Sequence, residues 1–93
     1  MTANPLFHLG QTIITPTALT ALTHEEVIAA LGQHVAGQWG DVDRIRYQSN
    51  QFGLENNGPL ISAFVSHIAG TRFYVITDWD RSQTTIMLSG ECW

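Results

Sequence analysis

The sequence predicts an α+β domain in which a three- to four-stranded antiparallel meander sheet packs against N-terminal helices. Helix signals lie in the part of the chain up to residue 53, and β-branched and aromatic runs dominate after residue 60. Short segments join these late runs, and strands joined by short connections pair antiparallel. With 93 residues, 44% of them hydrophobic, the chain is expected to form a single domain over residues 1–93 around one core.

The first element is predicted to be a strand that ends at Thr15. The segment 6–15 finishes in a β-branched run, and Pro16 stops it because proline has no amide hydrogen for a strand ladder. Thr15 is a suitable N-cap and proline is favoured at the first helical position, so a short helix is predicted over 16–22. We expect the first strand to join the same sheet as the later strands.

The second helix has the clearest start signal. Thr23-His24-Glu25-Glu26 fits a capping box, in which the Thr23 hydroxyl and the Glu26 carboxylate each accept the other residue's backbone N–H. Apolar residues then recur at helical spacing, at Val27, Ile28, Leu31 and Val35. Gly37 suits the left-handed conformation that often follows a helix, so a helix is predicted over 24–36.

A third helix is predicted after Trp39-Gly40. Asp41 is its expected N-cap and Gly53 its expected end, because these residue types favour those positions. The stripe expected to face the core consists of Val42, Ile45 and Phe52. We interpret Trp39 as a core residue whose indole N–H reaches a carbonyl, the alternative being an exposed binding anchor.

The last third of the chain predicts the sheet. Its β-rich runs cover 60–67, 72–77 and 84–89, and the segments 68–71 and 78–83 separate them. In the first run the apolar side chains of Ile61, Ala63 and Val65 alternate with Ser62 and Ser66. This alternation is typical of a meander that packs one face on helices.

The charge balance argues against nucleic acid as a partner. The chain has four arginines, no lysine and eight carboxylates, with a net charge of −4. Nucleic-acid affinity depends on clustered cationic contacts that release counterions, and four scattered arginines do not supply them. No acidic run is longer than two residues, so mimicry of a DNA backbone by the whole chain is not expected either.

Cysteine usage and hydropathy indicate the compartment. Cys92 is the single cysteine, which excludes an internal disulfide and any multi-cysteine metal site. The N-terminus lacks a basic segment followed by a long apolar one, and no stretch approaches the roughly 18 apolar residues of a membrane span. We expect a cytoplasmic protein that uses no cofactor.

Catalytic and metal-binding patterns are missing from the sequence. The histidines have no ligand spacing and no accompanying thiolates; they are His8, His24, His34 and His67. No serine occupies a nucleophile elbow, and no glycine-rich phosphate loop occurs. A hydrolase built on Asp78, Asp80 and His34 has no pocket to support it, so we expect a protein that is not an enzyme.

Two motifs carry a resemblance to a known family. HVxGxWGD at 34–41 and ITxxDRSxTT at 76–85 resemble segments of small plasmid-related bacterial proteins that occur on plasmids and other mobile elements. The similarity covers nearly the whole chain and departs at the C-terminus, where residues 88–93 replace the Leu-Pro-x-Glu-Tyr-like tail of the family. Some members are described as methyltransferase subunits of restriction–modification systems, but this chain lacks the Asn-Pro-Pro-aromatic loop and cofactor site that such an enzyme needs.

Size, charge and this resemblance together favour a small protein-interaction module of a mobile genetic element. Its sharpest form is an antidefence protein, an anti-CRISPR or anti-restriction inhibitor that binds a host protein complex. The alternative is a homo-oligomeric accessory or scaffold protein, in which an exposed edge strand or aromatic patch closes a homodimer.

The residues predicted to bind a protein partner centre on the second hairpin. Trp79 is the main candidate because it stands in a loop between two carboxylates, and aromatic side chains dominate interface energies. The turn chemistry of the loop is expected to be structural first, with the aspartates capping backbone amides and Arg81 pairing with either of them. The full predicted set is Trp79, Asp78, Asp80, Arg81, Tyr74 and Trp93.

Overall fold

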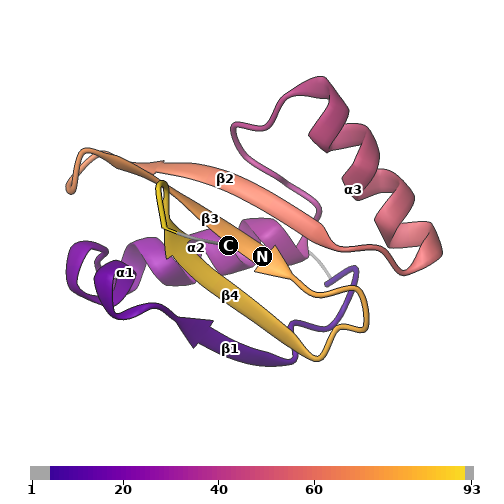
Figure 1. Ribbon diagram of the computed structural model, residues 1–93, viewed down its shortest axis with the longest axis horizontal. Coiled ribbons are helices and arrows are strands. Elements are labelled where there is room, and N and C mark those ends of the chain that lie inside the picture. Colours follow the sequence, from indigo (N-terminus) through magenta and orange to yellow (C-terminus); the bar gives the residue numbers. More distant parts are fainter. Residues whose placement is uncertain (1–4, 92–93) are drawn as a thin grey trace.

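The computed structural model describes residues 5–91, which fold into a four-stranded sheet and three helices (Figure 1). The elements are β1 (Gln11–Ile14), α1 (Pro16–Ala21), α2 (His24–Val35), α3 (Arg44–Asn56), β2 (Leu60–Ser66), β3 (Thr71–Thr77) and β4 (Gln83–Leu88). Across the sheet the strand order is β1-β4-β3-β2. The α+β class predicted from the sequence is confirmed.

The sheet is mixed, so the prediction of a purely antiparallel meander is wrong at its first strand. β2, β3 and β4 pair antiparallel, as their short connections require. β1 joins the same sheet as predicted but runs parallel to β4, from Gln11 opposite Gln83 to Ile14 opposite Ile86. Three helices separate β1 from β2 along the chain, and a connection of this length leaves the direction of β1 open.

The two faces of the sheet are covered differently. Helices α1 and α2 pack on one face (Figure 1). The core between them consists of Ala18, Leu22, Val27, Ala30, Phe73, Val75 and Ile86. A smaller cluster of Ile61, Ile76 and Met87, with Tyr74 against it, lies on the other side of the sheet. In β2 it is the serine face that meets α2, since Ser62 is bonded to His34 of that helix.

The first two helices follow their sequence signals closely. The Thr15 hydroxyl caps α1 and Pro16 is its first residue. Both hydrogen bonds of the predicted capping box open α2, and Gly37 after its end has φ of +79°. Within the described ranges of the chain, none of the helices has the length and apolar character that crossing a membrane requires.

Helix α3 differs from its prediction in its bounds and in the face it buries. Its N-cap is Asp43, and it runs past Gly53 to Asn56. Asp41 is instead bound beside β2, where its N–H donates to the carbonyl of Ala63. The buried residues of α3 are Asn50 and Gly53.

The predicted apolar stripe of α3 is wrong because the helix meets the sheet through polar groups. Ile45 and Phe52 are 74% and 67% exposed, and Val42 precedes the helix and is half-buried. The inward face is set by Asn50, which hydrogen-bonds the backbone of β2. A periodicity argument that looks for apolar residues does not detect such a face.

Side chains and backbone of preceding segments cover the outer edge of β2. The Asn50 amide accepts from the N–H of Ile61 at 3.0 Å and donates to its carbonyl at 2.8 Å. Gly40 forms a parallel bridge with Ala63. A Cβ at Gly40, whose φ is +73°, would lie 2.2 Å from the Ala63 carbonyl oxygen, so only glycine permits this approach.

Candidate functional site

The candidate site is built on the tight turn that joins β3 to β4. The N–H of Asp78 donates to the carbonyl of Gln83, and the N–H of Arg81 donates to the carbonyl of Asp78. One carboxylate oxygen of Asp80 accepts the N–H of Ser82 at 3.0 Å. The Ser82 side chain first, and then its backbone N–H, lower the pKa of Asp80. The predicted capping role of this aspartate is confirmed.

Arg81 fastens this turn to the end of α3. Its guanidinium donates to four backbone carbonyls, those of Gly58 (2.6 Å), Gly53 (2.9 Å), Asp78 (3.1 Å) and Trp79 (3.2 Å). It also lies 5.6 Å from the centre of the Phe7 ring, a cation–π distance. Burial lowers the pKa of Arg81. The predicted pairing with Asp78 or Asp80 is wrong, because the backbone carbonyls take its donors.

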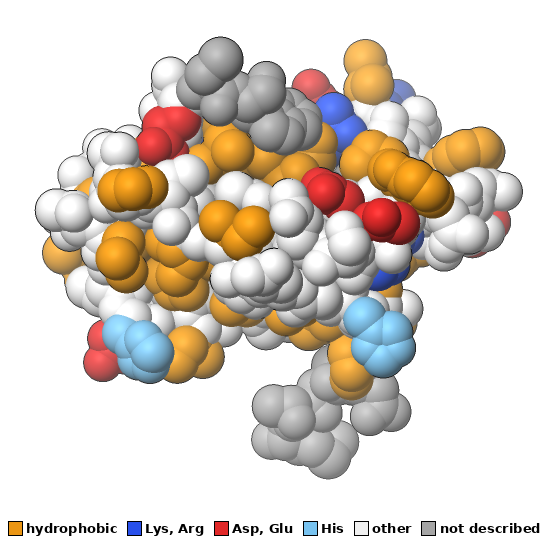
Figure 2. All heavy atoms as spheres, turned by 60° about the horizontal axis from the view of Figure 1, so that its bottom comes forward, with side chains coloured by type: hydrophobic (Ala, Val, Ile, Leu, Met, Phe, Trp, Pro, Cys, Tyr) orange, Lys and Arg blue, Asp and Glu red, His pale blue; other side chains and the backbone are white. Residues whose placement is uncertain are grey.

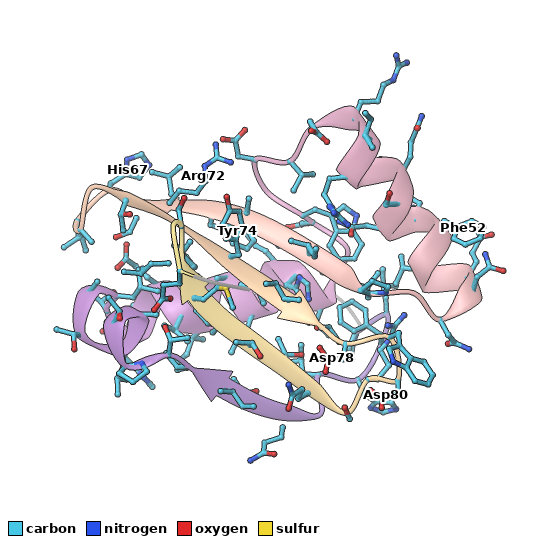
Figure 3. The ribbon with its side chains drawn as sticks, viewed as in Figure 1. Phe52, His67, Arg72, Tyr74, Asp78 and Asp80 are labelled. Carbon is cyan, nitrogen blue, oxygen red and sulfur yellow. The ribbon has the colours of Figure 1, made fainter. Side chains whose placement is uncertain are left out.

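This attachment places two exposed aromatic side chains at one end of the molecule. Trp79 is 63% exposed and Phe52 is 67% exposed, and the carbonyls of Trp79 and of the residue after Phe52 share the Arg81 guanidinium. Figure 3 shows Phe52 on α3 and Asp80 on the β3–β4 turn toward the right-hand end of the view, with Asp78 nearer to its middle. We call Trp79, Phe52, Asp78 and Asp80 the hairpin–helix surface.

Tyr74 and Trp93 complete the predicted set of binding residues. Tyr74 is half-buried on the sheet face opposite α1 and α2, away from the hairpin–helix surface (Figure 3). Trp93 lies outside the described residues. Sequence reasoning missed Phe52 as a surface residue because its spacing from Ile45 placed it on a predicted core stripe.

Tyr74 lines a groove of about 300 Å³ between the sheet and the start of α3. Its floor is apolar, from Ile61, Ala63 and Ile76, and Asp41, Asp43, Arg46 and Arg72 contribute charged groups. Arg72 is paired with Asp41 across the rim. Because two carboxylates face two guanidinium groups, the groove has no net preference for an anion or a cation.

His34 is the buried centre of a hydrogen-bond network. Its Nδ1 is 2.6 Å from the Ser62 hydroxyl and its Nε2 is 2.8 Å from the Thr77 hydroxyl. The network continues from Thr77 to Thr84 at 2.7 Å, and Thr84 donates to the carbonyl of Leu9. His34, Ser62, Thr77 and Thr84 are all fully buried.

The donor and acceptor roles along this network determine which nitrogen of His34 carries the proton. The Leu9 carbonyl can only accept, so Thr84 uses its one hydrogen there and must accept from Thr77. Thr77 therefore accepts from Nε2–H of His34, and the free Nδ1 accepts from Ser62 in the neutral ring. Burial, with a smaller effect of the Arg81 charge, lowers the pKa of His34 to about 4.

The Ser62–His34–Thr77 arrangement has the contacts of a nucleophile and its base but not their accessibility. A nucleophile must reach a substrate, and each of these side chains has no exposed surface. Sequence reasoning considered these residues singly. One feature of the sequence could have indicated the network: Ser62, Thr77 and Thr84 are hydroxyl residues at helix-facing positions of neighbouring strands.

Trp39 belongs to the same interior, as predicted. It is 2% exposed, its indole N–H donates to the side-chain oxygen of Gln51 at 3.1 Å, and its ring meets His34 edge-on at 5.5 Å. The remaining histidines, His8, His24 and His67, are exposed. Among residues 5–91 no three His, Cys, Asp or Glu side chains are grouped as a metal site would need.

Comparison of the chain with protein-family models, with curated proteins and with solved structures finds no match.

Arg81 supports a first prediction about the stability of the hairpin. Arg81→Ala removes four hydrogen bonds and the contact with Phe7, so we expect it to lower the free energy of unfolding by about 2 kcal/mol. Arg81 also has a φ of +60°, which glycine adopts without strain. Arg81→Gly should therefore be about 1 kcal/mol more stable than Arg81→Ala.

Urea unfolding of the two variants, with Arg44→Ala at an exposed position as control, measures both effects. A loss of stability in Arg81→Ala no greater than in the control would show that the guanidinium does not hold the turn to α3.

Proposed function

We propose that this protein is a small, non-enzymatic protein-interaction module that binds its partner through the hairpin–helix surface. The observation that carries the proposal is the exposed Trp79 side chain on a turn fixed by Arg81. A large aromatic side chain held on a rigid support binds with little loss of conformational freedom. Such residues provide most of the energy at protein interfaces.

The chemistry of the surface indicates the chemistry of the partner. Trp79 and Phe52 offer apolar area, and Asp78 and Asp80, which flank Trp79 in the sequence, add carboxylates. A partner that fits has an apolar pocket wide enough for an indole, bordered by arginine or lysine side chains. Basic side chains form no continuous patch on the face shown in Figure 2, and the chain has only four of them. Protein is therefore a better match than nucleic acid.

The resemblance to plasmid-related proteins supports a more specific version of this proposal. A cytoplasmic protein of a mobile element gains from blocking host defence, and a rigid surface that covers part of a defence complex needs no catalytic group. We therefore propose a restriction or CRISPR complex as the partner. Expression of the protein should protect a plasmid from cleavage by the sensitive system.

Trp79→Ala tests the binding surface. The Trp79 side chain is exposed and its indole N–H donates to no other described residue, so the variant should keep the wild-type melting temperature. Its affinity for the partner should fall by about 2 kcal/mol or more, roughly 30-fold, as for an interface hot spot. Immobilised wild-type and variant proteins exposed to a host extract, followed by titration of the purified partner, measure the loss.

Ile68→Ala is the matched control, because Ile68 is a 74%-exposed apolar residue in the connection between β2 and β3. It should bind as the wild type does and protect the plasmid equally well. Equal binding by both variants would contradict the proposed surface. Tight, salt-dependent binding of duplex DNA would contradict a protein partner.

A further inference from the structure

The two edges of the sheet differ in how their backbone groups are satisfied. At the β2 edge, Asn50 binds both outward groups of Ile61, and the segment through Gly40 binds those of Ala63. Among residues 5–91, no segment binds the outward backbone groups of β1 in this way. Proteins usually cover or charge an exposed edge strand, since its free N–H and C=O groups attract another strand.

The free groups of β1 belong to Thr12 and Ile14. The N–H groups of Gln11 and Thr15 donate to Ser82 and Ile86 beside β4. Alternate residues of a strand point to opposite sides, so the backbone groups of Thr12 and Ile14 point away from the sheet. In the described part of the chain, no hydrogen bond reaches them from that side.

Strand β1 and the helix that follows it carry no charged side chain, and the carboxylate of Glu91 accepts a hydrogen bond from the Thr15 hydroxyl next to the end of the strand. From Leu9 to Thr23 the sequence contains no Asp, Glu, Lys or Arg. Figure 2 brings the β1 side of the molecule forward; hydrophobic and uncharged polar side chains make up much of that face, and acidic side chains lie to the right of its centre. Strand β1 therefore brings no charged side chain of its own against a second copy of a protein whose net charge is −4.

We infer that the β1 edge pairs with the β1 edge of a second copy of this chain, antiparallel about a twofold axis at Ile13. In this register Thr12 lies opposite Ile14 of the second copy, and both outward groups of each residue are bonded. Pro16 has no N–H and ends the paired stretch. The result is one continuous sheet through two molecules, and it does not involve the hairpin–helix surface.

The self-pairing places the two Ile13 side chains directly opposite each other. Ile13 is 36% exposed, and its own backbone groups face β4, so this is the close, non-hydrogen-bonded pair of an antiparallel ladder. Like charges at such a position repel and opposite charges attract. Charged substitutions at position 13 can therefore test whether the two strands pair and whether they do so about a twofold axis at this residue.

The test is sedimentation equilibrium of the full chain. The short strand predicts a small interface, with a dissociation constant of about 10–100 µM for the wild-type dimer. Ile13→Lys and Ile13→Glu should each be monomeric, with dissociation constants raised at least about tenfold. An equimolar mixture of the two variants should form a heterodimer. Circular dichroism confirms that each variant is folded.

Val65→Lys is the matched control, a 46%-exposed β-branched residue on the opposite edge strand, and it should dimerise as the wild type does. The inference is overturned if the wild type stays monomeric up to about 1 mM, if Ile13→Lys still dimerises, or if the mixture stays monomeric. It is also overturned if Val65→Lys abolishes the dimer. Trp79→Ala should leave the dimer intact, so failure here is separate from failure of the proposed partner surface.

Discussion

Lowering the pH from 7 to 4 should reduce the free energy of unfolding by about 3 kcal/mol through His34 alone. The pKa of His34 is about 4 in the folded protein, against about 6.5 in an unfolded chain. Between these values the unfolded state binds a proton that the folded state does not. The contribution of His34 is therefore complete above pH 6.5 and disappears as the pH falls to 4.

The physical cause is the fully buried network around the imidazole. Burial comes first, because a charged ring loses its hydration and gains no carboxylate partner. The Arg81 guanidinium adds a smaller repulsion. Protonation would also put a hydrogen on Nδ1, so that Ser62 would have to turn its own hydrogen elsewhere in a site with no exposed surface.

Urea unfolding at pH values from 7.5 to 4 measures the effect. About 2 kcal/mol of the loss should fall above pH 5. This window separates His34 from the carboxylates of Glu26, Asp80 and Glu91, whose pKa values are lowered. Stability that depends on those groups is lost only as the pH falls below about 4.5.

His34→Gln should be less stable at neutral pH but nearly independent of pH between 6.5 and 5. His24→Gln, at an exposed position on the same helix, should keep the wild-type slope. A wild-type free energy of unfolding that stays constant from pH 6.5 to 5 would contradict a buried, neutral His34.

Local signals predicted those elements whose start and end are set within a few residues. The capping residues Thr15 and Thr23 act on their own helices, and the short turns of the β2–β3–β4 meander allow only one strand direction. The direction of β1 had no such local determinant. It depends on where the chain lies after α3 has placed β2 at the far edge, which is a property of the whole fold.

The sequence predicted one part of the candidate site, the exposed Trp79, but not the position of Phe52 or the partners of Arg81. Turn chemistry correctly indicated that Trp79 stands exposed between the aspartates. The exposure of Phe52 depends on which face of α3 points inward. The buried amide of Asn50 determines that face, and an apolar stripe does not. The partners of Arg81 are backbone carbonyls from distant segments, and backbone groups leave no residue-type signal in a sequence.

Asn50→Ala should lower the free energy of unfolding by about 3–4 kcal/mol, the largest single-residue effect expected outside the hydrophobic core. Asn50 is fully buried and makes both of its hydrogen bonds to the backbone of Ile61. Removing the amide leaves an N–H and a C=O of β2 without partners next to α3. Each unpaired buried group costs about 1–3 kcal/mol, and the lost packing adds to this.

Asn56→Ala is the matched control on the same helix. Its side chain donates to the carbonyl of Phe52 at an exposed position, where water replaces the lost bond, so its effect should stay within about 0.5 kcal/mol. Thermal unfolding should show a melting temperature about 15 °C lower for Asn50→Ala and nearly unchanged for Asn56→Ala. If the two alanine variants were equally stable, the Asn50 amide would not be what holds α3 to the edge of the sheet, and the exposed position of Phe52 would need another cause.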